Sequence, residues 1–367
     1  MNSSSVDREP KLPKFAFVFF GIAAVCLVFY LIAIFCTPFA DFFNRYISSF
    51  FRALLAYVTN LLPFSLAEIL IILSPAILVL LIIFAVKKYT ATWRHVGIYV
   101  LTVFSVLSLF FSSFILTFGT GYYTSKFEDK LELERHEVSA KELAETADWL
   151  IQNVNNEIEN IEFKEKSSSV MPYSLREMNN KLLDAYRNLS GQYDFFPTLT
   201  SYVKPIMLSE PMTYTHITGV YTFFTGEANL NTNSPDYTLA FTAAHELAHQ
   251  RGISREDEAN FTAFLACINS DDAYIRYCGY LNLCEYVLNA LYSADTKLWE
   301  EAYTKLDTRA IYEMIAYSEF FDKYRDSVAA DISGAINDAY LQANNTQGTA
   351  SYGLVVDLAV SYFKSSK

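Results

Sequence analysis

Residues 241–267, FTAAHELAHQRGISREDEANFTAFLAC, hold two histidines four positions apart with a glutamate directly after the first. On a helix, His245 and His249 lie on one face and can bind the same ion. Such a pair suits tetrahedral Zn²⁺, which keeps an open position for water and lowers its pKa to about 7. Glu246 is turned about 100° from His245, where it can take a proton from that water. The pattern predicts a zinc site with Glu246 as catalytic base, on a helix that ends at Gly252.

An acidic run rich in small residues follows the motif. Ser254 suits the N-cap of a second helix that begins at Arg255. On that helix, Glu256 and Asn260 share a face, whereas Glu258 points almost the opposite way. We therefore expect Glu256 to be the third zinc ligand and Asn260 to hydrogen-bond a ligand histidine. Glu258 is the alternative third ligand.

Two simpler explanations stand beside the zinc prediction. An H-E-x-x-H arises by chance in on the order of one chain in a hundred of this length, so the motif alone can be a pair of surface histidines with an incidental glutamate. Asp257 and Glu258 also fit a solvated first helical turn, where carboxylates favour the helix dipole. A chance motif of surface histidines does not explain the second helix, which carries acidic, amide and small residues on one face.

The rest of the chain predicts a membrane protein. Hydrophobic residues make up 52% of the 367 residues, more than in an average soluble protein. Three segments, 15–36, 66–86 and 96–118, are nearly uncharged, and each is long enough to span a bilayer as a helix. The sequence predicts a three-helix membrane anchor over residues 1–125 and a separate domain over residues 126–367.

Basic residues lie on one side of the predicted anchor: Arg8, Lys11, Lys14, Lys87, Lys88 and Arg94. The positive-inside rule places these segments in the cytoplasm, so the N-terminus is cytoplasmic and the domain after residue 125 is extracytoplasmic. Residues 1–125 carry 8 Lys and Arg against 4 Asp and Glu; residues 126–367 carry the remaining 20 against 36, a net charge of −16. A domain this acidic is not expected to bind nucleic acid.

The pattern after residue 125 indicates a mainly helical α+β domain. Residues 139–161 open with a Ser-x-x-Glu capping box and repeat apolar residues at helical spacing, as residues 174–189 do. Residues 200–232 are rich in β-branched and aromatic residues and read as strands. Within the anchor, residues 41–62 are amphipathic, and either lie in the membrane interface or pack on the spans.

The H-E-x-x-H followed by E-x-x-x-N resembles the glutamate-zincin metallopeptidases, in which the first acidic residue of the second motif binds zinc. A wider resemblance covers nearly the whole chain. The motif, together with LPFSLAEIL, KPIMLSE, TGEANLN and INDAYLQANNTQGTASYG, resembles a bacterial membrane-protein family known as domain of unknown function 3810. The resemblance implies a zincin-like outer domain on three spans in a bacterial cytoplasmic membrane.

In zincin folds an edge strand before the motif helix pairs with an extended peptide substrate, and residues 219–231 suit that role. An internal strand of a small sheet is the alternative. Glu227 near its end either binds a substrate amine or faces solvent, and we expect solvent. Side chains that could stabilise an oxyanion are His216, Arg251, Tyr280 and Tyr352. Cys267, Cys278 and Cys284 could hold one disulfide, but buried thiols on helices fit the pattern better.

Together these observations favour a membrane-anchored zinc metallopeptidase that hydrolyses peptides or envelope proteins outside the membrane. A non-catalytic zincin-fold module of a membrane complex is the alternative, and a zinc hydrolase of non-peptide substrates is a third reading. Glu246 favours the catalytic interpretation, because a structural zinc site does not need a general base.

Overall fold

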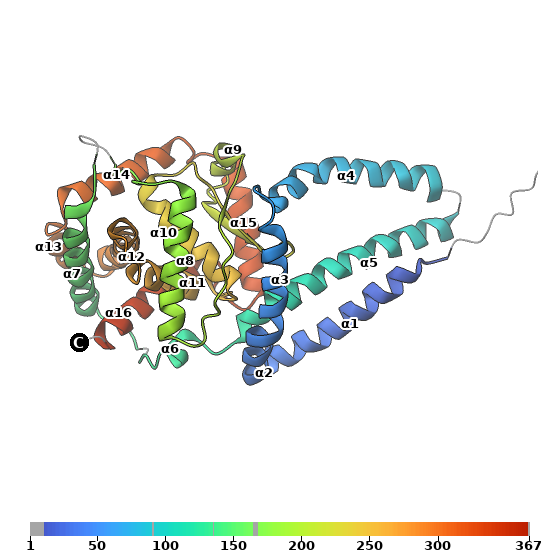
Figure 1. Ribbon diagram of the computed structural model, residues 1–367, viewed down its shortest axis with the longest axis horizontal. Helices are drawn as coiled ribbons and strands as arrows, with labels where there is room; N and C mark the ends of the chain where they lie inside the picture. The colour runs from blue at the N-terminus through green and yellow to red at the C-terminus, as the bar shows by residue number, and fades with distance from the viewer. Residues whose placement is uncertain (1–10, 90–91, 135, 164–167, 366–367) are drawn as a thin grey trace, which may run out of the picture.

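The computed structural model describes residues 11–89, 92–134, 136–163 and 168–365, without the side chains of residues 88, 89 and 352. Arg8 and the side chains of Lys88 and Tyr352, which the sequence singled out, lie outside the described part. The chain is mostly helical, with three long helices at one end and a larger helical body with a small sheet at the other (Figure 1). We name this larger part the outer body, after the side of the membrane on which the sequence predicts it.

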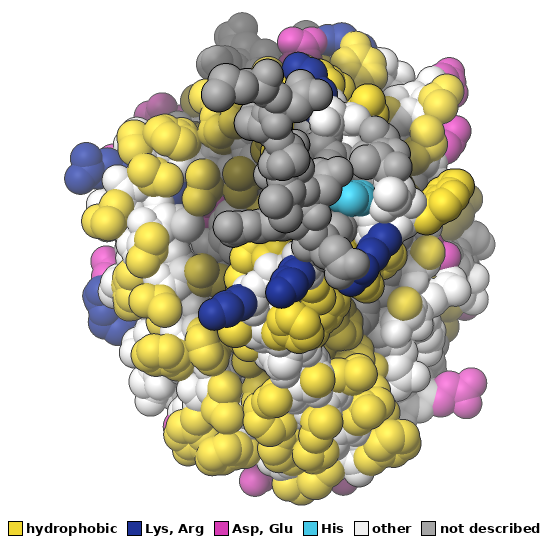
Figure 2. Space-filling model, turned by 90° about the vertical axis from the view of Figure 1, so that its right-hand side faces the viewer, with side chains coloured by type: hydrophobic (Ala, Val, Ile, Leu, Met, Phe, Trp, Pro, Cys, Tyr) yellow, Lys and Arg dark blue, Asp and Glu magenta, His cyan; other side chains and the backbone are white. Residues whose placement is uncertain are grey.

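Three helices in the described residues are long and apolar enough to cross a membrane, as predicted: α1 (Lys14–Phe35), α4 (Leu66–Tyr89) and α5 (Trp93–Thr117). Their mean hydropathies are 2.8, 3.2 and 2.2. Helix α5 begins earlier than its apolar run because Thr92 caps it by accepting a hydrogen bond from the His95 N–H. The far ends of these helices present mostly hydrophobic side chains, with several Lys and Arg side chains near the centre of the view (Figure 2).

The segment between the first two spans is helical from Thr37 to Thr59, as α2 (Thr37–Phe42), a π-helical segment (Phe43–Ser48) and α3 (Ser49–Thr59). One face of α3 is buried against α5 and the outer body, where the Arg52 guanidinium donates to the Thr117 carbonyl (2.9 Å) and to Asn44 Oδ1 (2.8 Å). Phe50, Leu54 and Val58 on the opposite face are exposed. Residues 41–62 therefore pack on a span and also keep an apolar outer face.

The outer body consists of helices of very different lengths. They are α6 (Phe127–Lys130), α7 (Ala140–Glu157), α8 (Leu175–Gln192), α9 (Ser209–Thr213), α10 (Asp236–Gln250), α11 (Glu256–Ile268), α12 (Ala273–Ala294), α13 (Thr296–Tyr303), α14 (Thr308–Asp322), α15 (Val328–Ala343) and α16 (Val355–Ser365), with 3₁₀ turns at Gly119–Tyr123, Ile158–Asn160 and Gly348–Leu354. The predicted capping box of α7 is present, with Ser139 and Glu142 bonding each other's backbone N–H. Helices α7, α10, α11 and α12 form the centre of the core.

The sheet has three short strands, β1 (Lys204–Pro205), β2 (Gly219–Thr222) and β3 (Glu227–Leu230), in the order β1-β3-β2. Strand β3 pairs in parallel with β1 and antiparallel with β2. The predicted strand region 219–231 is therefore a hairpin whose first strand lies at an edge and whose second strand is internal. Helix α10 packs against β2 and β3, which brings the sheet to the H-E-x-x-H motif.

Candidate metal centre

The two motif histidines and Glu256 converge between α10 and α11. The Nε2 atoms of His245 and His249 lie 3.2 Å and 3.3 Å from one Glu256 carboxylate oxygen, Oε2. One ligand atom from each of the three residues lies within 4.8 Å of the others. All three side chains are nearly buried, with 11%, 6% and 9% of the side chain exposed. The helical spacing of the histidines produces this convergence, and the close packing of α11 on α10 supplies the carboxylate.

Hydrogen bonds fix the orientation of both imidazoles. His245 Nδ1 lies 2.8 Å from Asn260 Oδ1, and His249 Nδ1 lies 2.7 Å from the Ile253 carbonyl. Both partners are oxygen acceptors, so in the neutral imidazoles the Nδ1 atoms carry the protons and the Nε2 atoms carry lone pairs. Those lone pairs point at the Glu256 carboxylate. Three electron-pair donors that face one another in a buried space are the arrangement a cation requires.

The charges of the cluster act strongly on one another. Burial lowers the pKa of His249, but the Glu256 carboxylate outweighs burial and raises that pKa to about 9. Burial raises the pKa of Glu256, but His249 and His245 outweigh it and hold that pKa well below its usual range. The His249 imidazolium and the Glu256 carboxylate therefore stabilise each other's charged forms, and a bound cation would take over the role of the imidazole proton.

Glu246 lies beside this cluster rather than in it. The side chain is buried, and burial raises the pKa of its carboxyl. The Tyr221 backbone N–H of β2 bonds this carboxylate. A Cβ atom added at Gly219 would lie 2.6 Å from Glu246 Oε1, so only glycine lets β2 approach so closely. Among the described residues, Glu246 Oε2 has no hydrogen-bond partner. The carboxylate thus keeps one free acceptor next to the three converging atoms.

The turn between the two helices depends on Gly252. Its φ of +94° lies in the region that glycine adopts without strain, and a Cβ atom there would lie 2.3 Å from the Arg52 guanidinium. The predicted cap of the second helix was wrong by one residue. Helix α11 begins at Glu256 with Arg255 as N-cap, because Ser254 Oγ instead donates to the Phe118 carbonyl (2.9 Å) at the end of α5.

Glu258, the alternative third ligand, points away from the metal cluster. Its carboxylate accepts from the Phe127 N–H (3.0 Å) and from Arg255 Nε (2.9 Å). The reading of Asp257 and Glu258 as a solvated first turn was wrong, because both side chains are buried. Contacts from α6 and its neighbours cover this end of α11, and a single sequence does not display such contacts.

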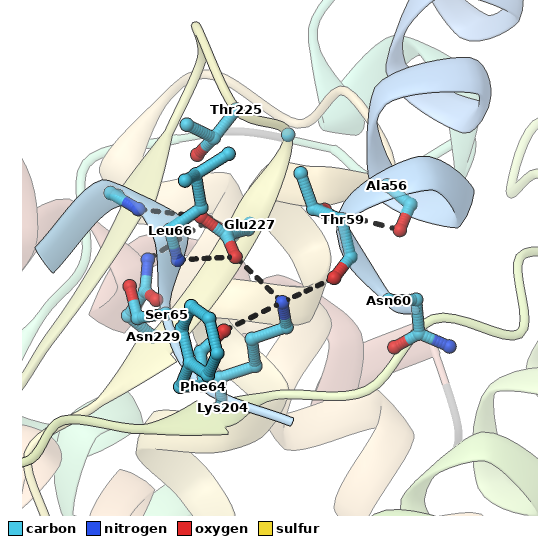
Figure 3. Close-up of polar contacts among 12 residues, drawn as sticks. Ala56, Thr59, Asn60, Phe64, Ser65, Leu66, Lys204, Thr225, Glu227 and Asn229 are labelled. Carbon is cyan, nitrogen blue, oxygen red and sulfur yellow. Dashed lines mark hydrogen bonds and ion pairs between the residues drawn. The ribbon is translucent and has the colours of Figure 1, made fainter. Parts of the chain in front are cut away.

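The expectation that Glu227 faces solvent was wrong. Its side chain is 1% exposed and forms an ion pair with Lys204 Nζ at 2.6 Å. The same carboxylate accepts the N–H groups of Leu66 (2.9 Å) and Ala67 (2.8 Å), the first residues of α4 (Figure 3). Lys204 also donates to the carbonyls of Thr59 (2.6 Å) and Phe64 (3.0 Å). Glu227 therefore caps a membrane helix, and it does not face a substrate.

Three of the predicted oxyanion residues have other partners. His216 Nε2 lies 2.9 Å from the Tyr324 carbonyl. The Arg251 guanidinium donates to the carbonyls of Leu247 and Leu199 and lies over the Tyr186 ring, and Tyr280 packs against Trp149 and Phe264. The fourth, Tyr352, lies outside the described side chains. All five cysteines are free, and Cys267, Cys278 and Cys284 are buried thiols.

Two tyrosines near the cluster carried no signal in the sequence, because 26 tyrosines are spread along the chain. Burial, with contributions from the charges of Glu285 and Glu256, raises the pKa of Tyr286 to about 12. Burial also raises the pKa of Tyr340 to about 12, and the Glu256 charge adds to this. The Tyr340 hydroxyl accepts a hydrogen bond from the Tyr122 hydroxyl (3.2 Å), so its own proton stays available to a third group.

Comparison with known proteins gives a family. The family described as "Protein of unknown function (DUF3810)" matches residues 41–360. Neither a curated protein nor a solved structure matches the chain. The matched range includes α3, two of the three long apolar helices, the sheet and both helices of the cluster. Because the match covers most of the chain, this protein belongs to the DUF3810 family.

Proposed function

We propose that this protein is a membrane-anchored zinc metallopeptidase, with His245, His249 and Glu256 as the metal ligands and Glu246 as the catalytic base. The observation that carries the proposal is the convergence of two imidazole Nε2 atoms on one Glu256 oxygen, beside a buried Glu246 with a free acceptor oxygen. Following the distribution of basic residues, we place the site on the outer side of a bacterial cytoplasmic membrane.

The residues present fit Zn²⁺. With both protons on Nδ1, Glu256 Oε2 receives no hydrogen bond from the described residues, and a buried carboxylate oxygen without a partner is costly. Two imidazoles and one carboxylate form the ligand set of several catalytic zinc sites. When bound, the ion acts as a Lewis acid that lowers the pKa of a water ligand to about 7 and polarises a substrate carbonyl.

The remaining steps belong to the chain's own residues. Glu246 holds the proton taken from the attacking water and passes it to the leaving amine, and its burial favours that protonated state. The edge strand β2 offers backbone groups to an extended peptide beside Glu246. We assign the donor to the developing oxyanion to Tyr340, whose hydroxyl proton is not used in its bond with Tyr122.

Glu246→Gln in the full-length chain, purified in detergent, tests the proposal. Zinc content should stay near one ion per chain and the melting temperature should not change, because Gln fills the same space. Turnover of a peptide library should fall by about 10²–10⁴-fold, the usual contribution of a general base. Equal cleavage by the variant and the wild type would exclude catalysis by Glu246.

The near burial of the cluster favours one other candidate, a structural zinc site in a non-catalytic module. The same pair of proteins distinguishes it. A structural site predicts one zinc per chain in both proteins and no peptide cleavage by either. Wild-type protein that binds no zinc and keeps full thermal stability would exclude both functions.

A further inference from the structure

The structure assigns a substrate class to the proposed peptidase site: polypeptide segments tethered to the same bilayer, which reach the site along β2 from the membrane surface. This inference rests on the proposed function and is argued from where the site lies relative to α5. Three sets of contacts carry it.

The metal cluster lies directly at the outer end of α5. The ring of Phe118, the residue after the last helical residue Thr117, lies 5.6 Å from the His249 ring and 5.4 Å from the Tyr221 ring. The Phe118 carbonyl accepts the Ser254 hydroxyl in the turn between α10 and α11. The site is therefore within about one helical turn's length of the end of a predicted span.

Strand β2 leads from the catalytic residue toward the bilayer. At its first residue, Gly219 touches Glu246. Beyond its last residue, the rings of Phe223 and Phe224 lie 5.0 Å from the Phe110 ring of α5. Phe110 precedes the helix end Thr117 by seven residues, or about 10 Å along the helix axis. The turn after β2 thus lies against α5 within the predicted membrane span.

Two other helices, α3 and α15, indicate where the membrane surface lies. Helix α3 runs across the long axis at the junction of the spans with the outer body, and α15 runs across it nearby (Figure 1). Each exposes one apolar stripe with helical spacing, Phe50, Leu54 and Val58 on α3 and Val328, Ile332 and Ile336 on α15. A helix that keeps such a stripe beside apolar spans is typical of the membrane interface.

The edge of β2 opposite β3 has no strand neighbour and faces the catalytic residue, because the Tyr221 N–H at this edge bonds Glu246. A peptide paired with this edge runs parallel to the line from the membrane to Glu246. The strand has 4 residues, which span about 13 Å. The bond above Glu246 is thus about four or five extended residues from the bilayer, a distance that suits a segment close to its own membrane anchor.

Matched tethered substrates test this in vesicles that contain the full-length protein. The probe is a pool of random octapeptides between a fluorophore and a quencher, joined to a Leu/Ala membrane-spanning helix. One pool has a spacer of five Gly/Ser residues, and the other has forty, which spread the segment over about 35 Å. Both spacers give the same surface density, so a difference in rate reports distance from the bilayer.

The short-spacer pool should be cleaved at least tenfold faster than the long-spacer pool, with Glu246→Gln vesicles as background. Equal rates, or faster cleavage of the long-spacer pool, would overturn the inference and leave the proposed function standing. Absence of cleavage of either pool and of the same octapeptides free in solution would overturn both, since no peptidase would then exist to have this preference.

A second measurement does not depend on activity. In the Glu246→Gln background, Phe224→Trp adds an indole beside α5, and lipids brominated along their acyl chains should quench the added fluorescence. Tyr312→Trp on α14, whose native side chain is 44% exposed, is the matched control away from the spans and should not be quenched. Equal quenching of the two added indoles would overturn the placement of the β2 turn in the membrane.

Discussion

The Lys204–Glu227 pair and the cluster of His245, His249 and Glu256 are both buried and charged, but they differ in how their polar atoms are satisfied. In the Lys204–Glu227 pair, the ammonium donates to two carbonyls and to the carboxylate, and the carboxylate also accepts two backbone N–H groups (Figure 3). In the cluster of His245, His249 and Glu256, neutral imidazoles turn two lone pairs toward a carboxylate oxygen, which then has no hydrogen-bond donor among the described residues.

The difference separates a structural ion pair from a candidate ligand site. A buried ion pair is stable only where further hydrogen bonds satisfy its remaining atoms, and the Lys204–Glu227 pair meets that condition from within the chain. The histidine cluster does not meet it, although its side chains are held as firmly by Asn260 and Ile253. Firm orientation without internal satisfaction is typical of a preorganised metal site.

The largest effect is expected from Glu256→Ala, which leaves the two histidines without their carboxylate. Zinc affinity should fall by on the order of 10⁴-fold, or about 5.5 kcal/mol, on a scale where structural zinc sites reach about 10–16 kcal/mol. Chelator competition on the purified full-length protein measures this. Unchanged affinity would remove Glu256 from the ligand set and would place the histidine cluster with the structural pair.

Lys204→Met should produce the next largest effect, on stability and not on metal. Removal of the ammonium leaves Glu227 as an unpaired buried charge, which typically costs about 3–5 kcal/mol. Thermal unfolding in detergent should show the loss. The control is the double variant Lys204→Met/Glu227→Gln, which has no buried charge left and should recover most of the stability. A single variant as stable as wild type would contradict the structural role of the pair.

Asn260→Ala should weaken the metal site more gently. It removes the acceptor of the His245 Nδ1 proton and leaves all three ligand atoms in place. The expected loss is about 10–100-fold in zinc affinity, or roughly 1.4–2.8 kcal/mol. Asn260→Asp should restore binding because its carboxylate accepts the same proton. If alanine and aspartate give the same affinity, the hydrogen bond does not orient His245.

The smallest effect on the metal is expected from Glu258→Ala, two positions from Glu256 on the same helix. Zinc affinity should not change measurably, because Glu258 bonds Phe127 and Arg255 away from the cluster. Stability should fall by about 1–3 kcal/mol, since a buried N–H and a guanidinium lose their acceptor. Zinc titration and thermal unfolding of one sample measure both. Loss of zinc with this variant would mean that α11 is rotated.

The local features of the candidate site follow from helical periodicity, which a single sequence displays directly. Spacing of four places His245 and His249 on one face, and spacing of four places Glu256 with Asn260. The same spacing led us to expect a hydrogen bond between Asn260 and one of the two histidines, and the structure shows that this histidine is His245. Zinc binding and peptidase activity stay predictions, because the motif indicates which side chains could bind a metal but does not show that they do.

The spans and the helical character of the outer body were likewise set by the sequence, since length, hydropathy and capping are local properties. Tertiary structure alone decided which polar and charged side chains are buried and which partners they bind. We expected Glu227 to face solvent, yet its carboxylate caps the start of α4, more than 150 positions earlier in the chain. Ser254 does not cap α11, because its hydroxyl donates to the Phe118 carbonyl instead. Burial of a charge depends on partners brought from distant segments, and no window of sequence contains them.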